Sequence, residues 1–242
     1  MKVSQKIDSQ LKNIIEGVTF KYQDLTLEPS EYGAATKTVE RLIAEGKLQR
    51  ASKGVFYKPK QTIFGTLQPR EGELLKQYLF KNGQRVAYIT GASLYNQMGL
   101  TTQIPFTILL ASKSRRSGLL VIGNLKIKPV RSYVDVTNDN YYLLGILDAV
   151  KDFNKIPDMD AKSVITILTN ELRKLTPQQI IHLLQNALYY PPRTRALLGA
   201  ILETMDSSLD LNILKNSLNP LSKYKLGRTN NFLINLDKWN FK

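Results

Sequence analysis

The chain contains 242 residues, of which 43 % are hydrophobic, none is cysteine and one is histidine. This composition supports a packed core and excludes a disulfide scaffold, a cysteine-ligated zinc site and a cysteine nucleophile. Lysine and arginine number 34 against 20 aspartate and glutamate residues, which gives a formal net charge of +14. A positive field of this size attracts nucleic-acid phosphates or an anionic membrane surface.

The positive charge is spread along the whole chain. Residues 1–65 carry a net +4, residues 66–140 carry +6 and residues 141–242 carry +4, so the excess is not a basic tail on a neutral enzyme. The first residues are amphipathic and lack the apolar centre of a secretory signal. The longest apolar runs have the length of a strand, which is too short to cross a bilayer. We therefore expect a cytoplasmic protein without a membrane partner.

The first forty-five residues read as two helices separated by a short polar segment. Apolar side chains recur at helical spacing from Val3 to Ile15. Residues 22–25 have room for one or two further helical turns. A second helix is predicted from Glu31 to Glu45, with Ser30 as its N-cap and Gly46 as its stop.

The segment after Gly46 reads as a β-hairpin. Its predicted strands are residues 47–50 and 55–58, and Gly54 supplies the turn residue. Helix, short helix, helix and hairpin follow one another in the order of a winged helix-turn-helix. We therefore expect a winged helix-turn-helix DNA-binding domain in residues 1–65.

The rest of the chain has a mixed pattern. Residues 61–69 read as a linker and residues 70–80 as a helix. Residues 85–136 then alternate or run apolar at strand length around a short helix at residues 91–98, and strands are predicted at residues 85–89, 106–111, 119–122, 125–128 and 133–136. From residue 141 onward the pattern is helical. The predicted fold class is α+β, with a mixed α/β C-terminal domain over residues 70–242 that has a helical end.

The second helix and the hairpin carry the candidate DNA-binding residues. On a helical wheel Lys37 and Arg41 fall opposite the buried stripe, and Thr38 lies on one flank. Such side chains reach bases or phosphates from a helix in the major groove. The hairpin adds basic residues that would follow a phosphate backbone, namely Arg50, Lys53 and Lys58. An ordinary solvated helix face is the alternative, and Glu40 and Glu45 nearby favour it.

A second basic segment lies between two predicted strands. Arg115 and Arg116 occupy the loop "ASKSRRSG" and are candidates for contact with an anion or an acidic partner. A loop of this kind is more often simply exposed to solvent.

The sequence shows no signature of an active site. His182 is the single histidine, and without cysteine it cannot build a metal site. No glycine-rich phosphate loop and no nucleophile elbow occurs. We expect neither an enzyme nor a bound cofactor or metal. A nucleic-acid-modifying enzyme that uses the winged helix for recruitment, and a protein-interaction module, remain as alternatives.

Several segments resemble one known family. They are "KLQRASKGVFYKP" at residues 47–59, "RVAYITGASLYNQMGLTTQIPFTILLASKSRR" at residues 85–116, "RALLGAILETM" at residues 195–205 and "LNPLSKYKLG" at residues 218–227. The chain resembles in these segments the AbiEi family of antitoxins from type IV toxin–antitoxin operons, and "TGASLYNQMGLTTQIP" is the most specific part. The likeness covers most of the chain, but its motifs are structural and not catalytic.

The resemblance implies a bacterial repressor that binds inverted repeats in double-stranded DNA at its own promoter. It implies further that the C-terminal domain counteracts a nucleotidyltransferase-like toxin, without a stable complex between the two proteins. The family's DNA-binding role carries over to the helix and hairpin positions Lys37, Thr38, Arg41, Arg50, Lys53 and Lys58.

Overall fold

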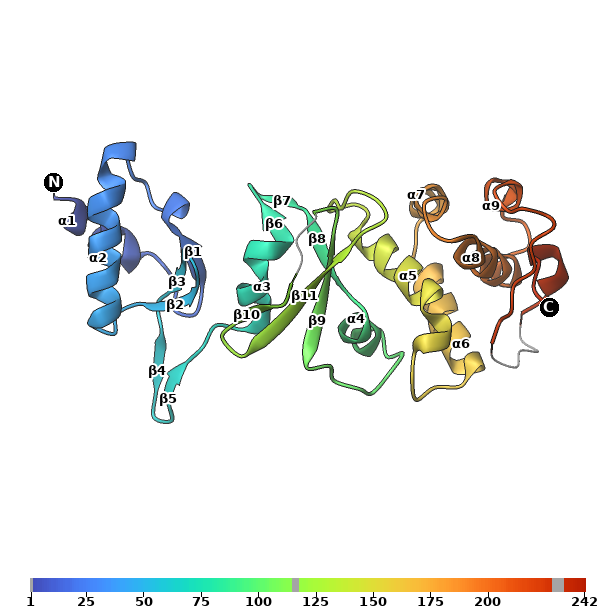
Figure 1. Cartoon of the computed structure of the whole chain (residues 1–242), viewed down its shortest axis with the longest axis horizontal. Coiled ribbons are helices and arrows are strands. Elements are labelled where there is room, and N and C mark those ends of the chain that lie inside the picture. The colour runs from blue at the N-terminus through green and yellow to red at the C-terminus, as the bar shows by residue number, and fades with distance from the viewer. Residues whose placement is uncertain (1, 115–117, 228–232) are drawn as a thin grey trace. The chain divides into compact units, whose positions relative to one another are not determined.

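The computed structural model describes residues 2–114, 118–227 and 233–242 and has mixed α+β architecture (Figure 1). The chain forms two compact units. The N-terminal unit comprises the residues up to Leu79 together with Val121–Leu125, and the C-terminal unit comprises Phe80–Leu120 and Lys126–Lys242. Among the described residues, no helix has both the length and the apolar character needed to cross a membrane.

The N-terminal unit begins with two helices. Helix α1 spans Val3–Lys12, the short 3-10 helices η1 and η2 span Tyr22–Asp24 and Pro29–Glu31, and α2 spans Tyr32–Ala44. The buried side of α2 consists of Ala35, Thr38, Val39 and Leu42. Because these positions follow the i, i+3, i+4, i+7 spacing, they form one stripe along the helix. The stripe packs with Ile7 and Leu11 of α1 in the core of the unit.

A three-stranded antiparallel sheet completes this core. Its strands are β1 (Thr19–Lys21), β2 (Gln49–Ser52) and β3 (Val55–Tyr57), in the order β1-β3-β2. Phe20 pairs with Phe56, and Arg50 pairs with Phe56 from the other side. A register shift between Arg50 and Ser52 leads into the turn at Gly54, whose φ is +73°. Left-handed backbone of this kind favours glycine, as the sequence indicated.

Three local predictions in this unit differ from the structure. Helix α1 ends at Lys12 and not at Ile15. Ser30 does not cap α2, because it lies inside the 3-10 turn that precedes it. The predicted linker is ordered instead as a hairpin, since β4 (Lys60–Thr62) pairs with β5 (Gly65–Leu67) around a Gly65 with φ +109°.

Helix α3 (Glu71–Leu79) belongs to the N-terminal unit. The backbone N–H of Thr19 donates to the Glu73 carboxylate at 3.2 Å, and the Thr19 hydroxyl donates to the Glu73 carbonyl oxygen at 3.1 Å. Gln77 and Ser52 are also hydrogen-bonded through their side chains. These contacts tie α3 to the three-stranded sheet, so the compact unit extends past the boundary predicted at residues 65–70.

The C-terminal unit combines β-strands with a helical end. The strands of this unit are β6 (Phe80–Lys81), β7 (Gln84–Arg85), β8 (Ala87–Thr90), β9 (Thr107–Ser112), β10 (Leu120–Ile122) and β11 (Leu125–Arg131). Strands β6 and β7 pair with each other, and the other four form a sheet in the order β10-β11-β9-β8. The turn between β10 and β11 belongs to the N-terminal unit. The helices are α4 (Ala92–Gln97), α5 (Tyr141–Lys151), η3 (Phe153–Lys155), α6 (Ala161–Arg173), α7 (Pro177–Ala187), α8 (Pro192–Met205), α9 (Asn212–Asn216) and η4 (Leu236–Trp239).

The sheet is mixed. Strand β9 runs antiparallel to β8 and parallel to β11. The strand predicted at residues 133–136 does not form, although Val134 and Val136 are buried. Their alternation reflects a segment that packs against the core without joining a sheet ladder. Alternating apolar residues indicate that every second side chain is buried, but they do not by themselves show that the segment pairs with a strand.

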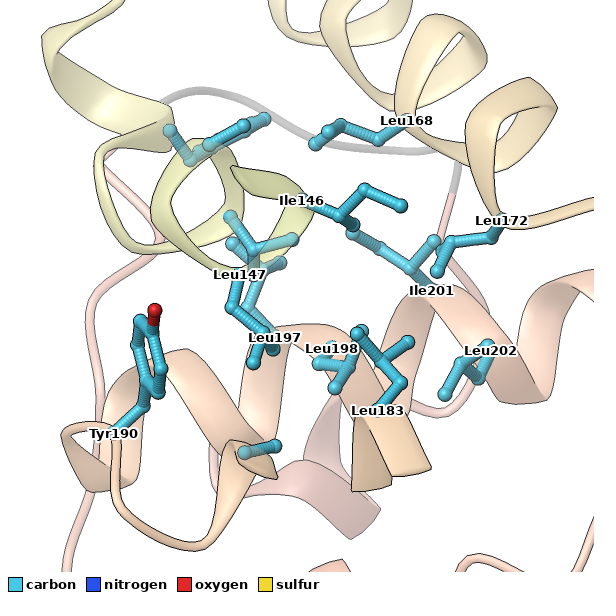
Figure 2. Close-up of a cluster of buried hydrophobic side chains, with 14 of the residues drawn as sticks. Ile146, Leu147, Leu168, Leu172, Leu183, Tyr190, Leu197, Leu198, Ile201 and Leu202 are labelled. Carbon is cyan, nitrogen blue, oxygen red and sulfur yellow. The ribbon is translucent and has the colours of Figure 1, made fainter. Parts of the chain in front are cut away.

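The core of the C-terminal unit lies between helices (Figure 2). Leu197, Leu198 and Ile201 of α8 point toward Ile146 and Leu147 of α5 and toward side chains of α6 and α7. Helix α8 is buried around most of its circumference. Gly199 on this helix faces the ring of Trp239, and a Cβ added there would overlap three ring carbons.

Candidate nucleic-acid interface

The exposed face of α2 carries the cations predicted for it. Lys37 and Arg41 are both exposed and lie one helical turn apart. Ala34 and Ala44, also exposed, bracket them. The small alanine side chains allow another macromolecule to approach the helix backbone closely. The exposed face of α2 therefore combines small side chains with two cationic groups.

Arg41 is engaged in a local ion pair. Its guanidinium lies 2.5 Å from the Glu45 carboxylate, which Lys47 also contacts at 2.8 Å. The hydrogen bond from Lys47, together with that from Arg41, lowers the pKa of Glu45. Because the Arg41 side chain is 51 % exposed, water screens the pair and its contribution to stability is small. The guanidinium can therefore exchange this partner for a phosphate or a base.

Thr38 lies away from the exposed face. Its side chain is only 8 % exposed, and its hydroxyl donates to the Ala34 carbonyl oxygen at 2.8 Å. The predicted flank position is thus part of the buried stripe, because residue 38 stands three positions after Ala35 and four before Leu42. Thr38 is consequently left out of the candidate interface.

The hairpin β2–β3 contributes three more cations. Arg50 and Lys53 are exposed, whereas Lys58 is half-buried just beyond β3. The Arg50 guanidinium lies 5.8 Å from the centre of the Phe56 ring, which holds its stem along the sheet. The Lys58 carbonyl accepts from the Gly17 N–H at 2.9 Å, and this bond fixes the backbone where the hairpin leaves the sheet. Arg50 and Lys53 are thus the more exposed of the three side chains.

Arg115 and Arg116 lie outside the described residues. Lys113 is described, and its ammonium donates to the Tyr133 carbonyl oxygen at 3.0 Å.

The sequence did not reveal a buried polar centre in the C-terminal unit. Asp148 on α5 is 3 % exposed. Its carboxylate accepts hydrogen bonds from Tyr88 at 2.8 Å and from Thr90 at 2.6 Å, and it pairs with the Lys151 ammonium at 2.8 Å. Tyr95 donates to the Asp152 carboxylate at 2.8 Å. The Asp148 carboxylate therefore has these partners within the C-terminal unit, and its hydrogen bonds from Tyr88 and Thr90 link β8 to α5.

Burial and the two carboxylates keep the tyrosines of this centre neutral. Desolvation is the largest cause that raises the pKa of Tyr88, Tyr95 and Tyr190, and the negative charge of Asp148 raises all three further. Burial alone would lower the pKa of Lys151, but the charge of Asp148, its hydrogen bond and the charge of Asp152 together outweigh burial and raise that pKa. The protonated form of every one of these groups is therefore favoured by folding.

We predict that the C-terminal unit loses stability above about pH 10, where an unfolded tyrosine begins to ionise. The folded chain holds the protons of Tyr88, Tyr95 and Tyr190 to higher pH, so the unfolded state binds fewer protons and gains in relative stability as the pH rises. Absorbance at 295 nm should show a group of tyrosinates that appears only as far-ultraviolet circular dichroism is lost.

Two variants distinguish the absorbance of the buried tyrosines from that of the exposed ones. Tyr88→Phe should reduce the delayed absorbance step, whereas Tyr189→Phe, at a residue that is 67 % exposed, should leave that step unchanged. Ionisation of all 12 tyrosines with unchanged circular dichroism would contradict the prediction.

No metal site is visible in the described part of the chain. Over residues 2–114, 118–227 and 233–242, no group of three or more potential ligands gathers in metal-binding geometry. His182 is exposed on α7 and lies 3.1 Å from the Gln178 amide, one helical turn away. A surface contact within one helix does not by itself constitute a catalytic arrangement.

The fold and the site together define a basic, mixed α+β protein with a small cation-bearing N-terminal unit. The chain belongs to the family of unknown function DUF6088, whose model matches residues 6–171. The matched range includes most of the N-terminal unit and extends through most of α6. Helices α7 to α9 lie beyond it.

One solved structure is similar over the whole chain. It is the crystal structure of the RV2827C protein from Mycobacterium tuberculosis, with 11 % sequence identity and a TM-score of 0.53, covering 100 % of this chain and 91 % of that one. At this identity the likeness concerns the fold. No curated protein matches the chain.

Proposed function

We propose that the N-terminal unit is a winged helix-turn-helix that binds double-stranded DNA. In this proposal α2 is the recognition helix and β2–β3 is the wing. The support is the chain order α1, η1, α2, β2, β3, together with a sheet in which β3 pairs with both β2 and β1. A helix of this kind enters the major groove, while the wing follows the phosphate backbone.

The observation that carries the proposal is the placement of exposed cations on both elements of one small unit. Lys37 and Arg41 lie on the open face of α2, and Arg50 and Lys53 lie on the hairpin that follows. Arginine at position 41 suits a bidentate contact with guanine, and the lysines suit phosphate. Lys58 adds a cation at the base of the wing.

We further propose that the chain is an autorepressor and the antitoxin of a type IV toxin–antitoxin operon. This setting rests on the sequence resemblance to the AbiEi antitoxins. Its operator would be inverted repeats in its own promoter, and its C-terminal unit would counteract a nucleotidyltransferase-like toxin without forming a stable complex.

Alanine variants distinguish base contacts from phosphate contacts. Arg41→Ala is expected to reduce discrimination between the operator and other DNA by about 1–3 kcal/mol, because a bidentate base contact is lost. Lys53→Ala should weaken binding on all duplexes and reduce the salt slope by about 1. Fluorescence anisotropy with the DNA upstream of the gene and with a scrambled duplex measures both effects.

The matched control removes a charge from the C-terminal unit. Lys174→Ala takes away a lysine that is 64 % exposed and paired with Glu171 on α6. It should leave binding to both duplexes unchanged. Wild-type affinity in both Arg41→Ala and Lys53→Ala would reject the docking mode proposed for α2 and the wing.

A further inference from the structure

The hairpin β4–β5 presents two large apolar side chains to solvent. Strand β4 pairs with β5 in the register Lys60 with Leu67 and Thr62 with Gly65, and the turn contains Ile63 and Phe64. The Ile63 side chain is 93 % exposed and the Phe64 side chain is 94 % exposed. Figure 1 shows the hairpin standing out from the body of the N-terminal unit. Ile63 and Phe64 are neighbours and form one contiguous exposed apolar tip, and contiguous apolar surface of this kind marks binding sites where single exposed residues do not.

Hydrogen bonds within the hairpin hold the tip in place. The Thr62 hydroxyl donates to the Gly65 carbonyl oxygen at 2.7 Å and accepts from the Phe64 N–H at 3.3 Å. Thr66 and Gln61 are bonded across the strands at 3.0 Å. The apolar side chains are therefore presented by a preorganised turn, which reduces the entropy that binding would otherwise cost.

The charge around the hairpin selects the kind of partner. Residues 46–70, which run from the end of α2 through the wing and the hairpin, contain six basic residues and no acidic one. Lys60 lies in β4 of the hairpin itself, and Lys58 and Arg70 flank the hairpin. Protein interfaces are depleted in lysine at their centres, whereas a DNA groove offers phosphates on both sides and base edges between them, and an apolar side chain reaches base faces by unstacking a step.

We propose that Phe64, supported by Ile63, is a wedge that enters the minor groove and inserts between base pairs. This inference rests on the proposed DNA-binding function and deepens it. Strands of three residues project the turn by roughly 10 Å at about 3.3 Å per residue, compared with a minor-groove depth of about 7.5 Å. Apolar wedges of this type unstack a base step and kink the duplex by about 20–90°.

Insertion of Phe64 should favour DNA sites that contain an easily unstacked base step. Pyrimidine–purine steps such as TA and CA unstack most easily, so the preferred duplexes should contain one at the kink. Lys58 and Lys60 would then contact the phosphates that border the opened minor groove, because a wedge of this type bends the duplex toward the major groove.

Bending of an end-labelled duplex tests the wedge directly. The probe is the DNA upstream of the gene, with a donor fluorophore at one end and an acceptor at the other, titrated with the full chain. Wild type should raise the transfer efficiency on binding. Phe64→Ala should abolish that rise and weaken binding about tenfold, within the range reported for removing an aromatic side chain that stacks on a base.

The control is an aromatic residue of equal exposure in the other unit. Phe106 is 96 % exposed, and Phe106→Ala should bend and bind DNA as wild type does. Bending and affinity that stay at the wild-type level in Phe64→Ala, while Lys37→Ala weakens binding, would overturn the wedge and leave the proposed function intact. Phe64-dependent bending of every duplex, whatever its sequence, would support the wedge and reject the autorepressor.

The alternative is that the exposed tip of the hairpin binds a second copy of the chain, and sedimentation velocity tests this alternative. The wedge predicts the same sedimentation coefficient for wild type and Phe64→Ala without DNA. A wild-type oligomer that dissociates in Phe64→Ala, combined with unchanged DNA bending, would overturn the proposal in favour of a protein contact.

Discussion

Gly199→Ala is expected to destabilise the C-terminal unit by about 3 kcal/mol, at the upper end of what overpacking a core costs. A Cβ at this position would overlap three carbons of the Trp239 ring, and Trp239 is itself 2 % exposed. The indole cannot move aside easily, because its N–H donates to the Glu203 carboxylate at 2.6 Å. Urea unfolding followed by the fluorescence of this single tryptophan measures the loss.

A second helical glycine in the same unit provides the control. In Gly145→Ala the new Cβ would lie 3.1 Å from the end of the Leu94 side chain, which is flexible and can shift by a few tenths of an ångström. The gain in helix propensity, about 1 kcal/mol, should offset that adjustment. Equal stability of Gly199→Ala and wild type would show that the helix and the Trp239 segment do not pack as described.

Asp148→Ala is expected to destabilise the same unit by about 3–5 kcal/mol, the usual result of removing one partner from a buried ion pair. The substitution leaves the Tyr88 and Thr90 hydroxyls without their acceptor and the partly buried Lys151 ammonium without its closest carboxylate. Asp148→Asn keeps an acceptor oxygen and should cost less. Thermal unfolding followed by circular dichroism ranks the two variants.

An exposed aspartate serves for comparison. Asp135 lies on the surface ahead of α5, and Asp135→Ala should leave the unfolding temperature nearly unchanged. An Asp148→Ala protein as stable as Asp135→Ala would mean that the polar centre contributes little to the fold.

The N-terminal elements could be predicted because their signals are local. The apolar stripe of α2, the stop at Gly46 and the turn at Gly54 each depend on neighbours within a few residues. The same reasoning misplaced Thr38, since a wheel drawn around Val39 alone underestimates how far the stripe extends toward residue 38. The hairpin at Lys60–Leu67 also had a local signal, namely a glycine after two apolar residues between short polar strands.

The buried polar centre could not be predicted, because its parts are distant in sequence. Tyr88 and Thr90 stand 60 and 58 residues before Asp148, and no local pattern reports that they meet. Asp148 itself lies within an apolar helix, and the sequence alone does not distinguish a buried carboxylate at this position from a solvent-exposed one. The same limit applies to Gly199, whose need for glycine comes from Trp239 on a segment at the far end of the chain.

Specific recognition of a DNA sequence by the N-terminal unit is the part of the proposed function on which the other proposals depend. The most direct measurement is an anisotropy titration of the full chain with two duplexes of equal length, at two salt concentrations. One duplex carries the DNA upstream of the gene and the other its scrambled sequence. We expect tighter binding to the upstream duplex at both salt concentrations, with the preference reduced in Arg41→Ala. Equal and steeply salt-dependent binding to both duplexes would contradict it, because the positive charge would then provide only general affinity for phosphate.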